Sequence, residues 1–111
     1  MDISIFAALA EPNRLRMVEI LRDEGPLTVG TIAERAGIRQ PQASKHLHAL
    51  SEAGLVEVRA EANRRYYMLR AEPFLQLEAW LDTCRRVWEQ RFDQLDQYLL
   101  EMQKNEDGNE P

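Results

Sequence analysis

Residues 28–69 read TVGTIAERAGIRQPQASKHLHALSEAGLVEVRAEANRRYYML, and this stretch decides the fold. Thr28 is a favourable N-cap, and the residues after it place apolar side chains on one side of a short helix up to Ala36. Gly37 supplies the positive φ that closes this helix. A second helix is expected to start near Gln40-Pro41 and to end at Ala53-Gly54, with inward-facing Ala43, Leu47 and Leu50.

Two strands are expected directly after these helices. Leu55–Arg59 and Arg65–Leu69 are rich in β-branched and aromatic residues, and the residues between them are small or polar. Asn63 is the residue that we expect to adopt the left-handed conformation at the bend. The order helix, tight turn, helix, hairpin predicts a helix-turn-helix followed by a β-hairpin wing.

The flanking segments predict three further helices. Residues 3–9 form a short apolar helix, which either packs on the core or contributes to a subunit interface. A helix starting at Glu11-Pro12-Asn13 and ending at Gly25-Pro26 has a broad apolar face, formed by Leu15, Met17, Val18, Ile20 and Leu21. The last helix runs from Pro73 to Met102. Its apolar stripe comprises Phe74, Leu77, Leu81, Cys84, Trp88, Leu95, Tyr98 and Met102, with a second edge of Trp80, Val87, Phe92 and Leu99.

A small domain cannot cover so long a stripe, so the last helix predicts a dimer with coiled-coil-like packing. The fold class is therefore mainly α with a small β-hairpin, in the order α-α-α-α-β-β-α, dimeric through the first and last helices. We expect one domain over residues 1–103, which binds DNA and dimerises, and a disordered polar tail over residues 104–111.

The composition limits the possible classes of protein. The chain has 111 residues, a net charge of −5 and one cysteine. It shows neither a long apolar run nor a signal peptide. We therefore expect a cytoplasmic protein without a membrane partner. The charge is unevenly distributed: residues 35–70 carry seven basic and three acidic side chains, whereas acidic residues predominate on both sides. Local positive charge over the helix-turn-helix favours binding to phosphates.

The exposed side of the second helix suits the reading of base edges in the major groove, because Gln pairs with adenine, Lys donates to guanine and Ser serves either base. Arg39 precedes this helix, and two arginines lie at the hairpin tip where they suit backbone or minor-groove contact. The candidate DNA-binding residues are Arg39, Gln40, Gln42, Ser44, Lys45, His48, Arg64 and Arg65. Strand alternation lets only one of the two wing arginines share a face with Tyr67. His46 either touches DNA or packs against Leu47 and Leu50.

Four segments in fixed order resemble the ArsR/SmtB group of bacterial winged-helix repressors: EPNRLRMVEIL (11–21), LTVGTIAERAGI (27–38), QPQASKHLHALSEAGLVEVR (40–59) and NRRYYML (63–69). The resemblance implies a homodimer that binds an imperfect palindromic operator in double-stranded DNA and represses transcription. It places Gln40, Gln42, Ser44 and Lys45 on the family's reading helix, and Arg64 and Arg65 on its wing. The chain departs from the family pattern at Arg39, where Ser is common, and at Asn63, where Gly is usual.

The metal ligands of many family members have no counterpart here. Residues 28–36 contain no Cys or His, the last helix contains no His, and the chain's two histidines lie on the reading helix. We therefore expect no metal site and no cofactor, and the last helix resembles a subgroup without metal ligands. Two alternatives stay open: a repressor that senses a ligand or thiol oxidation through Cys84 or a pocket between the long helices, and a winged-helix protein-interaction module. An enzyme is not expected, since no phosphate loop or nucleophile elbow is present.

Overall fold

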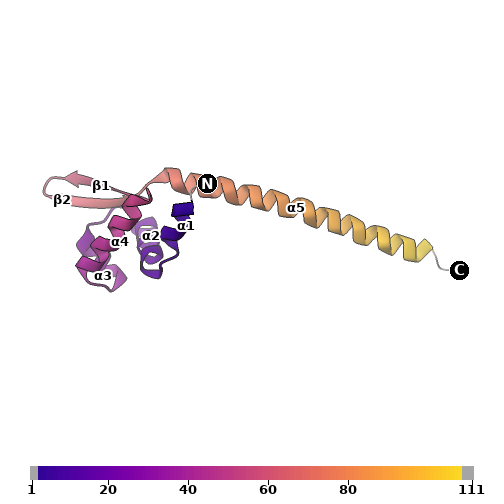
Figure 1. Ribbon diagram of the computed structural model, residues 1–111, viewed down its shortest axis with the longest axis horizontal. Coiled ribbons are helices and arrows are strands. Elements are labelled where there is room, and N and C mark those ends of the chain that lie inside the picture. Colours follow the sequence, from indigo (N-terminus) through magenta and orange to yellow (C-terminus); the bar gives the residue numbers. More distant parts are fainter. Residues whose placement is uncertain (1–2, 109–111) are drawn as a thin grey trace. The chain divides into compact units, whose positions relative to one another are not determined.

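The computed structural model describes residues 3–108 of the chain. The elements follow the predicted order, and the chain divides into two compact units after Gln76. In order they are α1 (Ile3–Leu9), α2 (Pro12–Glu24), α3 (Val29–Ala36), α4 (Gln40–Glu52), β1 (Val56–Glu61), β2 (Arg64–Leu69) and α5 (Ala71–Gly108), as labelled in Figure 1. The fold class is confirmed: a helix-turn-helix of α3 and α4 is followed by a two-stranded antiparallel hairpin.

Local capping explains where the helices of the first unit begin and end. The Glu11 side chain precedes α2 and accepts a hydrogen bond from the Arg14 amide at 2.9 Å. Thr28 Oγ1 accepts from the Thr31 amide at 3.4 Å, as expected of an N-cap. Gly37 ends α3 with a φ of 69°, in the left-handed region that costs glycine nothing. These ends confirm the predicted helix-turn-helix.

The core of the first unit lies between the helices and the base of the hairpin. Its fully buried large side chains are Met17, Ile32, Leu47, Leu50, Leu55 and Val56. One prediction for this core was wrong: Leu15 is 43% exposed. The buried face of α2 is centred on Met17 and Leu21, and a 100° step per residue turns Leu15 about 140° from that centre.

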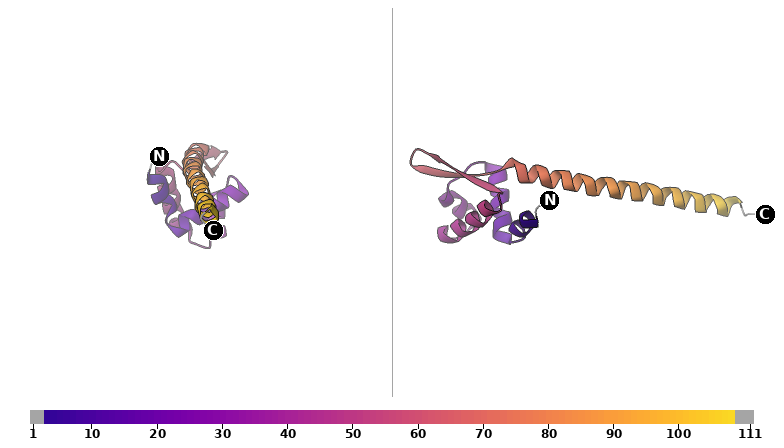
Figure 2. Two further views of the ribbon diagram at one scale, coloured as in Figure 1. Left: turned by 90° about the vertical axis from the view of Figure 1, so that its right-hand side faces the viewer. Right: turned by 45° about the horizontal axis from the view of Figure 1, so that its top comes forward.

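The hairpin pairs Val56 with Leu69 at its base and Glu61 with Arg64 at its tip. In Figure 1 and in the right view of Figure 2, it extends past α3 and α4. This register leaves a two-residue loop, and its first residue, Ala62, has a φ of 57°. The prediction that Asn63 takes the left-handed conformation was therefore wrong. The turns that close two-residue hairpins need a positive φ at the first loop position, whatever residue the sequence places there.

The base of the hairpin is fixed to the helices by a further backbone pairing. Leu27, just before α3, forms an antiparallel bridge with Tyr67 of β2. Each residue donates its amide to the other's carbonyl, at 3.0 and 2.8 Å. The wing and the start of the helix-turn-helix are thus held together by main-chain hydrogen bonds.

The second unit consists of α5 from residue 77 onward. The helix continues to Gly108, beyond its predicted end at Met102, and residues 109–111 of the expected tail lie outside the described part of the chain. Asp82 forms ion pairs with Arg85 and with Arg86, and such pairs one turn apart support a long helix. None of the described helices is apolar enough over sufficient length to cross a membrane.

Candidate nucleic-acid interface

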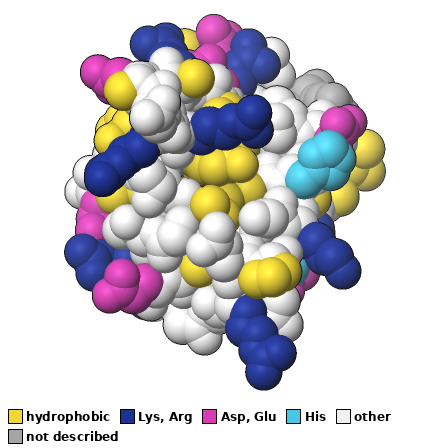
Figure 3. All heavy atoms as spheres, turned by 90° about the vertical axis from the view of Figure 1, so that its left-hand side faces the viewer, with side chains coloured by type: hydrophobic (Ala, Val, Ile, Leu, Met, Phe, Trp, Pro, Cys, Tyr) yellow, Lys and Arg dark blue, Asp and Glu magenta, His cyan; other side chains and the backbone are white. Residues whose placement is uncertain are grey.

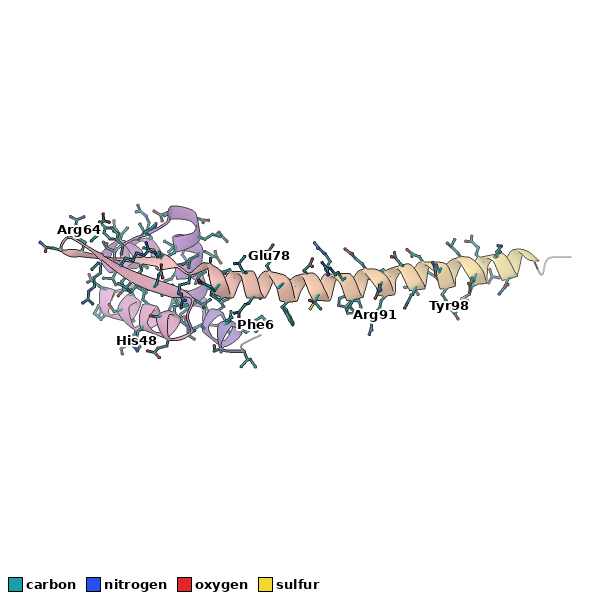
Figure 4. All side chains as sticks on the ribbon, turned by 90° about the horizontal axis from the view of Figure 1, so that it is seen from above. Phe6, His48, Arg64, Glu78, Arg91 and Tyr98 are labelled. Carbon is teal, nitrogen blue, oxygen red and sulfur yellow. The ribbon has the colours of Figure 1, made fainter. Side chains whose placement is uncertain are left out.

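Helix α4 has two chemically distinct sides. Ala43, Leu47 and Leu50 are 0% exposed and fix the helix on the core. The opposite side carries the polar residues that the sequence singled out, and each of them is exposed: Gln40, Gln42, Ser44, Lys45 and His48. Figure 4 labels His48 on this helix, and its Nε2 lies 3.7 Å from the Glu52 carboxylate. The structure thus leaves one polar side of α4 available for a ligand.

The start of α4 is capped in a way that the sequence analysis missed. Arg39 precedes the helix with extended backbone angles, but an arginine side chain has no acceptor for the free amides. Gln42 Oε1 instead accepts from the Arg39 amide at 3.4 Å. A Gln at the third helical position is the sequence signal for this contact, because it is the second half of a capping box. The remaining free amides give this end a partial positive charge.

His46 lies at the edge of the polar side of α4. Its side chain is 22% exposed, and its Nδ1 lies 3.6 Å from Glu11 Oε2. The same carboxylate accepts the hydrogen bond that begins α2, so Glu11 contacts both helices. His46 is therefore partly packed inside the unit rather than fully displayed. Sequence reasoning missed Glu11 because no local pattern brings it near residue 46.

The two wing arginines lie on opposite faces of the hairpin. Arg65 pairs with Ala60 and shares its face with Tyr67, whereas Arg64 pairs with Glu61 at the tip. Both are exposed, and Figure 4 shows Arg64 at the end of the wing. The prediction that only one arginine shares a face with Tyr67 follows from this alternation.

The basic residues between 35 and 70 differ in whether an acid neutralises them. Arg35, Arg59 and Arg70 pair with Glu24, Glu57 and Glu72 at 3.0, 3.3 and 3.7 Å. The hydrogen bond to Glu24 also raises the pKa of Arg35. Among the residues that the structure describes, no ion pair involves Arg39, Lys45, Arg64 or Arg65. Figure 3, viewed from the wing end, shows basic side chains spread over this face.

The unpaired cations thus lie at the start of α4, on α4 and at the wing tip. Their positive charge comes from the elements that a winged helix-turn-helix presents to DNA. In the described part of the chain, no three His, Cys, Asp or Glu side chains converge on a point that would hold a metal ion. The site is therefore a polar and basic surface.

Known proteins are similar to this chain in sequence and in fold. A protein-family model described as a helix-turn-helix domain matches residues 9–59 of the sequence. The HTH-type transcriptional regulator Rv0324 of Mycobacterium tuberculosis is 39% identical over 72 residues, which are 65% of this chain and 31% of that protein. The biofilm growth-associated repressor of Agrobacterium fabrum is 36% identical over 73 residues, covering 66% of this chain and 62% of the repressor. The chain thus spans about a third of the first relative and under two thirds of the second.

Two solved structures extend the comparison to the fold. The crystal structure of an ArsR family transcriptional regulator superposes with a TM-score of 0.66 and 34% identity, over 78% of this chain and 88% of that one. The second is the solution structure of the homodimeric winged helix-turn-helix DNA-binding domain Mb0332 from Mycobacterium bovis. It superposes with a TM-score of 0.61 and 35% sequence identity, over 72% of this chain and 73% of that one. The fold and site define a winged helix-turn-helix protein. More particularly, the chain belongs to the ArsR family of transcriptional regulators.

Proposed function

We propose that this chain is a sequence-specific DNA-binding repressor of transcription that acts as a homodimer in the cytoplasm. The observation that carries the proposal is the set of four unpaired cations, Arg39, Lys45, Arg64 and Arg65, on the reading helix and the wing. Other arginines of the same segment are neutralised by ion pairs. Free cations are the groups that bind phosphates, while the polar side of α4 offers base-reading amides.

In this proposal the reading helices of two copies enter successive major grooves on one face of the duplex. Gln40, Ser44 and Lys45 read base edges, His48 adds a contact further along α4, and Arg39 binds a phosphate near the helix start. Gln42 contributes through its outer amide group while its oxygen caps the helix. The wing holds the flanking DNA through the face of the hairpin that carries one of its two arginines, Arg64 or Arg65. Bound across a promoter, such a dimer blocks transcription initiation.

The homodimer is supported by two separate observations. The solution structure of Mb0332 is described as homodimeric. In this chain, α5 carries exposed large apolar side chains along its length, including Trp88 at 56%, Phe92 at 59% and Tyr98 at 60%. Apolar surface of this extent favours burial against another copy. A two-fold symmetric dimer requires an imperfect palindrome with half-sites one helical turn apart, about 10 base pairs.

We further propose that repression needs no metal ion. The Cys and His side chains available in the sequence are Cys84, His46 and His48, of which the histidines lie on α4. Metal sensing requires several such ligands at one point. Operator binding should therefore be the same with a chelator and with added Zn²⁺ or arsenite, and metal-dependent release would contradict this part of the proposal.

Selection of bound duplexes from a random DNA pool tests the main proposal. We expect the full chain to enrich a palindrome, and Lys45→Ala to enrich an altered motif because one base contact is lost. Arg16→Ala is a matched control, since Arg16 is an exposed cation on α2 outside the reading helix and wing. The control should enrich the original motif. Recovery of no common sequence by the wild-type chain would overturn the proposal.

A further inference from the structure

Three helices of the first unit meet at the corner that precedes α2. The Oε2 atom of Glu11 accepts a hydrogen bond from the Arg14 amide at 2.9 Å, and this bond begins α2. The same oxygen lies 3.6 Å from Nδ1 of His46, on the flank of α4. Because α2 packs against both α1 and α4 (Figure 1), this corner can hold all three helices together. One carboxylate thus links the start of α2 to the helix that carries the proposed base-reading residues.

The Glu11 carboxylate is available to His46 because the Arg14 side chain is engaged elsewhere. Nε of Arg14 donates to the Ala8 carbonyl at 2.8 Å, and Nη2 donates to the Ala7 carbonyl at 3.4 Å. The guanidinium therefore satisfies carbonyls near the end of α1. Among the described residues, His46 is the one basic side chain within ion-pair distance of Glu11. A carboxylate attracts an imidazole that presents an N–H, and attracts it more strongly when the ring is charged.

The contact between Glu11 and His46 is more shielded from water than the other ion pairs in the described part of the chain. The two side chains are 32% and 22% exposed. In each of the other pairs, at least one partner is 51% exposed or more. Opposite charges attract more strongly where less water surrounds them. Of the ion pairs described, this one is therefore best placed to hold two helices in a fixed relation.

The rotation of α4 about its own axis decides which of its side chains face outward. The buried face of the helix is formed by Ala43, Leu47 and Leu50. At 100° per residue, Lys45 lies about 170° from the centre of that face and His46 lies about 70° from it. A contact at His46 therefore acts on one flank of the helix, where it resists rotation. Rotation by about 20° would move an outward side chain, at a radius of about 6 Å, by roughly 2 Å.

We propose that Glu11 is a positioning residue for base reading, which acts through His46 by fixing the rotation of α4. The inference rests on the proposed function and extends it to a side chain outside the set of proposed DNA-contacting residues. The apolar contacts of the buried face hold α4 on the core but are not directional. A carboxylate on one flank supplies a direction, and with it the orientation of Lys45 and Ser44. A displacement of roughly 2 Å is large beside the range of about 0.5 Å over which hydrogen-bond lengths vary.

Base discrimination should depend on this contact more than phosphate attraction does. Attraction to phosphates depends on charge and tolerates small changes of direction, whereas a bidentate base contact requires a fixed geometry. Glu11→Gln should therefore lower the ratio between the affinity for the selected operator and the affinity for an operator with one altered base pair. We expect this ratio to fall by at least about fivefold, the smaller value for one base contact. A change that only weakened the fold would lower both affinities alike.

The variants are chosen so that the cap of α2 is kept. Glu11→Gln retains a side-chain oxygen that can accept from the Arg14 amide. Glu24→Gln is the matched control, because it removes the same charge from the other interhelical ion pair of α2, whose partner Arg35 lies on α3 at 3.0 Å. The control should discriminate between operators as the wild type does. His46→Gln leaves Glu11 in place, so it carries the same test if Glu11→Gln weakens the fold. Fluorescence anisotropy measures the affinities, and chemical denaturation measures the free energy of unfolding.

The double variant Glu11→Gln with His46→Gln separates positioning from direct contact with DNA. If the two residues act as a pair, the double variant should lose no more discrimination than the larger of the two single losses. Losses that multiply would show that His46 contacts DNA independently of Glu11, and would overturn the inference. Wild-type discrimination by Glu11→Gln, or an equal loss in Glu24→Gln, would also overturn it. A wild-type chain that prefers no operator would overturn the proposed function instead.

Discussion

Replacement of both wing arginines should change how DNA binding depends on salt. Arg64 and Arg65 are exposed and form no ion pair within the described residues, so Arg64→Ala with Arg65→Ala removes two free cations from each wing. The paired register places the two side chains on opposite faces of the hairpin. One face of a wing can lie toward the duplex at a time, so we expect one phosphate contact to be lost per wing.

The magnitude follows from counterion release. Each phosphate neutralised contributes about 0.9 to the slope of log K against log salt concentration, so the loss of one contact in each of two wings lowers the slope by about 1.8. When the salt concentration rises fourfold, from about 50 to about 200 mM, a slope difference of about 1.8 corresponds to a difference of about 12-fold in the loss of affinity. The wild-type dimer should lose about 12-fold more affinity than the double variant over this range.

Fluorescence anisotropy with a labelled duplex from the selection measures these slopes. Arg16→Ala with Arg22→Ala is the matched control, because it removes the same formal charge from exposed positions of α2. Of the two single wing variants, one should account for nearly the whole change. A double variant with the wild-type slope would refute phosphate contact by the wing, and equal contributions from the single variants would refute the argument from opposite faces.

Three predictions concern folding, each measured by chemical denaturation. Leu47→Ala should lower the free energy of unfolding by about 2–5 kcal/mol because the Leu47 side chain is fully buried. Leu15→Ala should lower it far less, because Leu15 is 43% exposed, and equal losses would contradict the packing of α4. Gly37→Ala should lower the free energy of unfolding by about 1–2 kcal/mol. The loss comes from the left-handed backbone alone, since nothing lies within 4 Å of an added Cβ, and a neutral result would contradict the turn geometry. Ala62→Gly should instead stabilise the chain by about 0.5 kcal/mol, and destabilisation would show that the positive φ carries no strain.

The helix-turn-helix could be predicted from the sequence because its determinants are local. Thr28, Gly37 and the apolar spacing of α3 and α4 each act within a few residues of the position that they control. The hairpin bend could not be placed as well. Its positive φ falls on Ala62 because of the register between β1 and β2, and that register depends on how the base of the hairpin packs on the core.

The exposed residues of α4 in the candidate site could be predicted from helical periodicity. The periodicity identifies the buried side of α4, and the other side chains are therefore expected to be exposed to solvent. The roles of individual residues were harder to foresee. Glu11 lies beside His46 only because α2 and α4 pack together, and such long-range contacts have no local signal. The long α5 was recognised from its stripe, but its end was set too early. The residues after Met102 are polar and continue no apolar stripe, so the sequence pattern gave no signal for the last turns of the helix.

The separation of α4 into a buried side and an exposed polar side has a consequence, under the proposed function, for how new operators arise. Substitutions at Ser44, Lys45 and His48 alter exposed side chains and are expected to change stability by less than about 0.5 kcal/mol. Under the proposed function, the fold can therefore change its preferred DNA sequence at these positions without losing its core. Gln42 is the exception, because its oxygen also caps the helix. Redesign of this protein for a new promoter should leave Gln42 in place and vary its exposed neighbours.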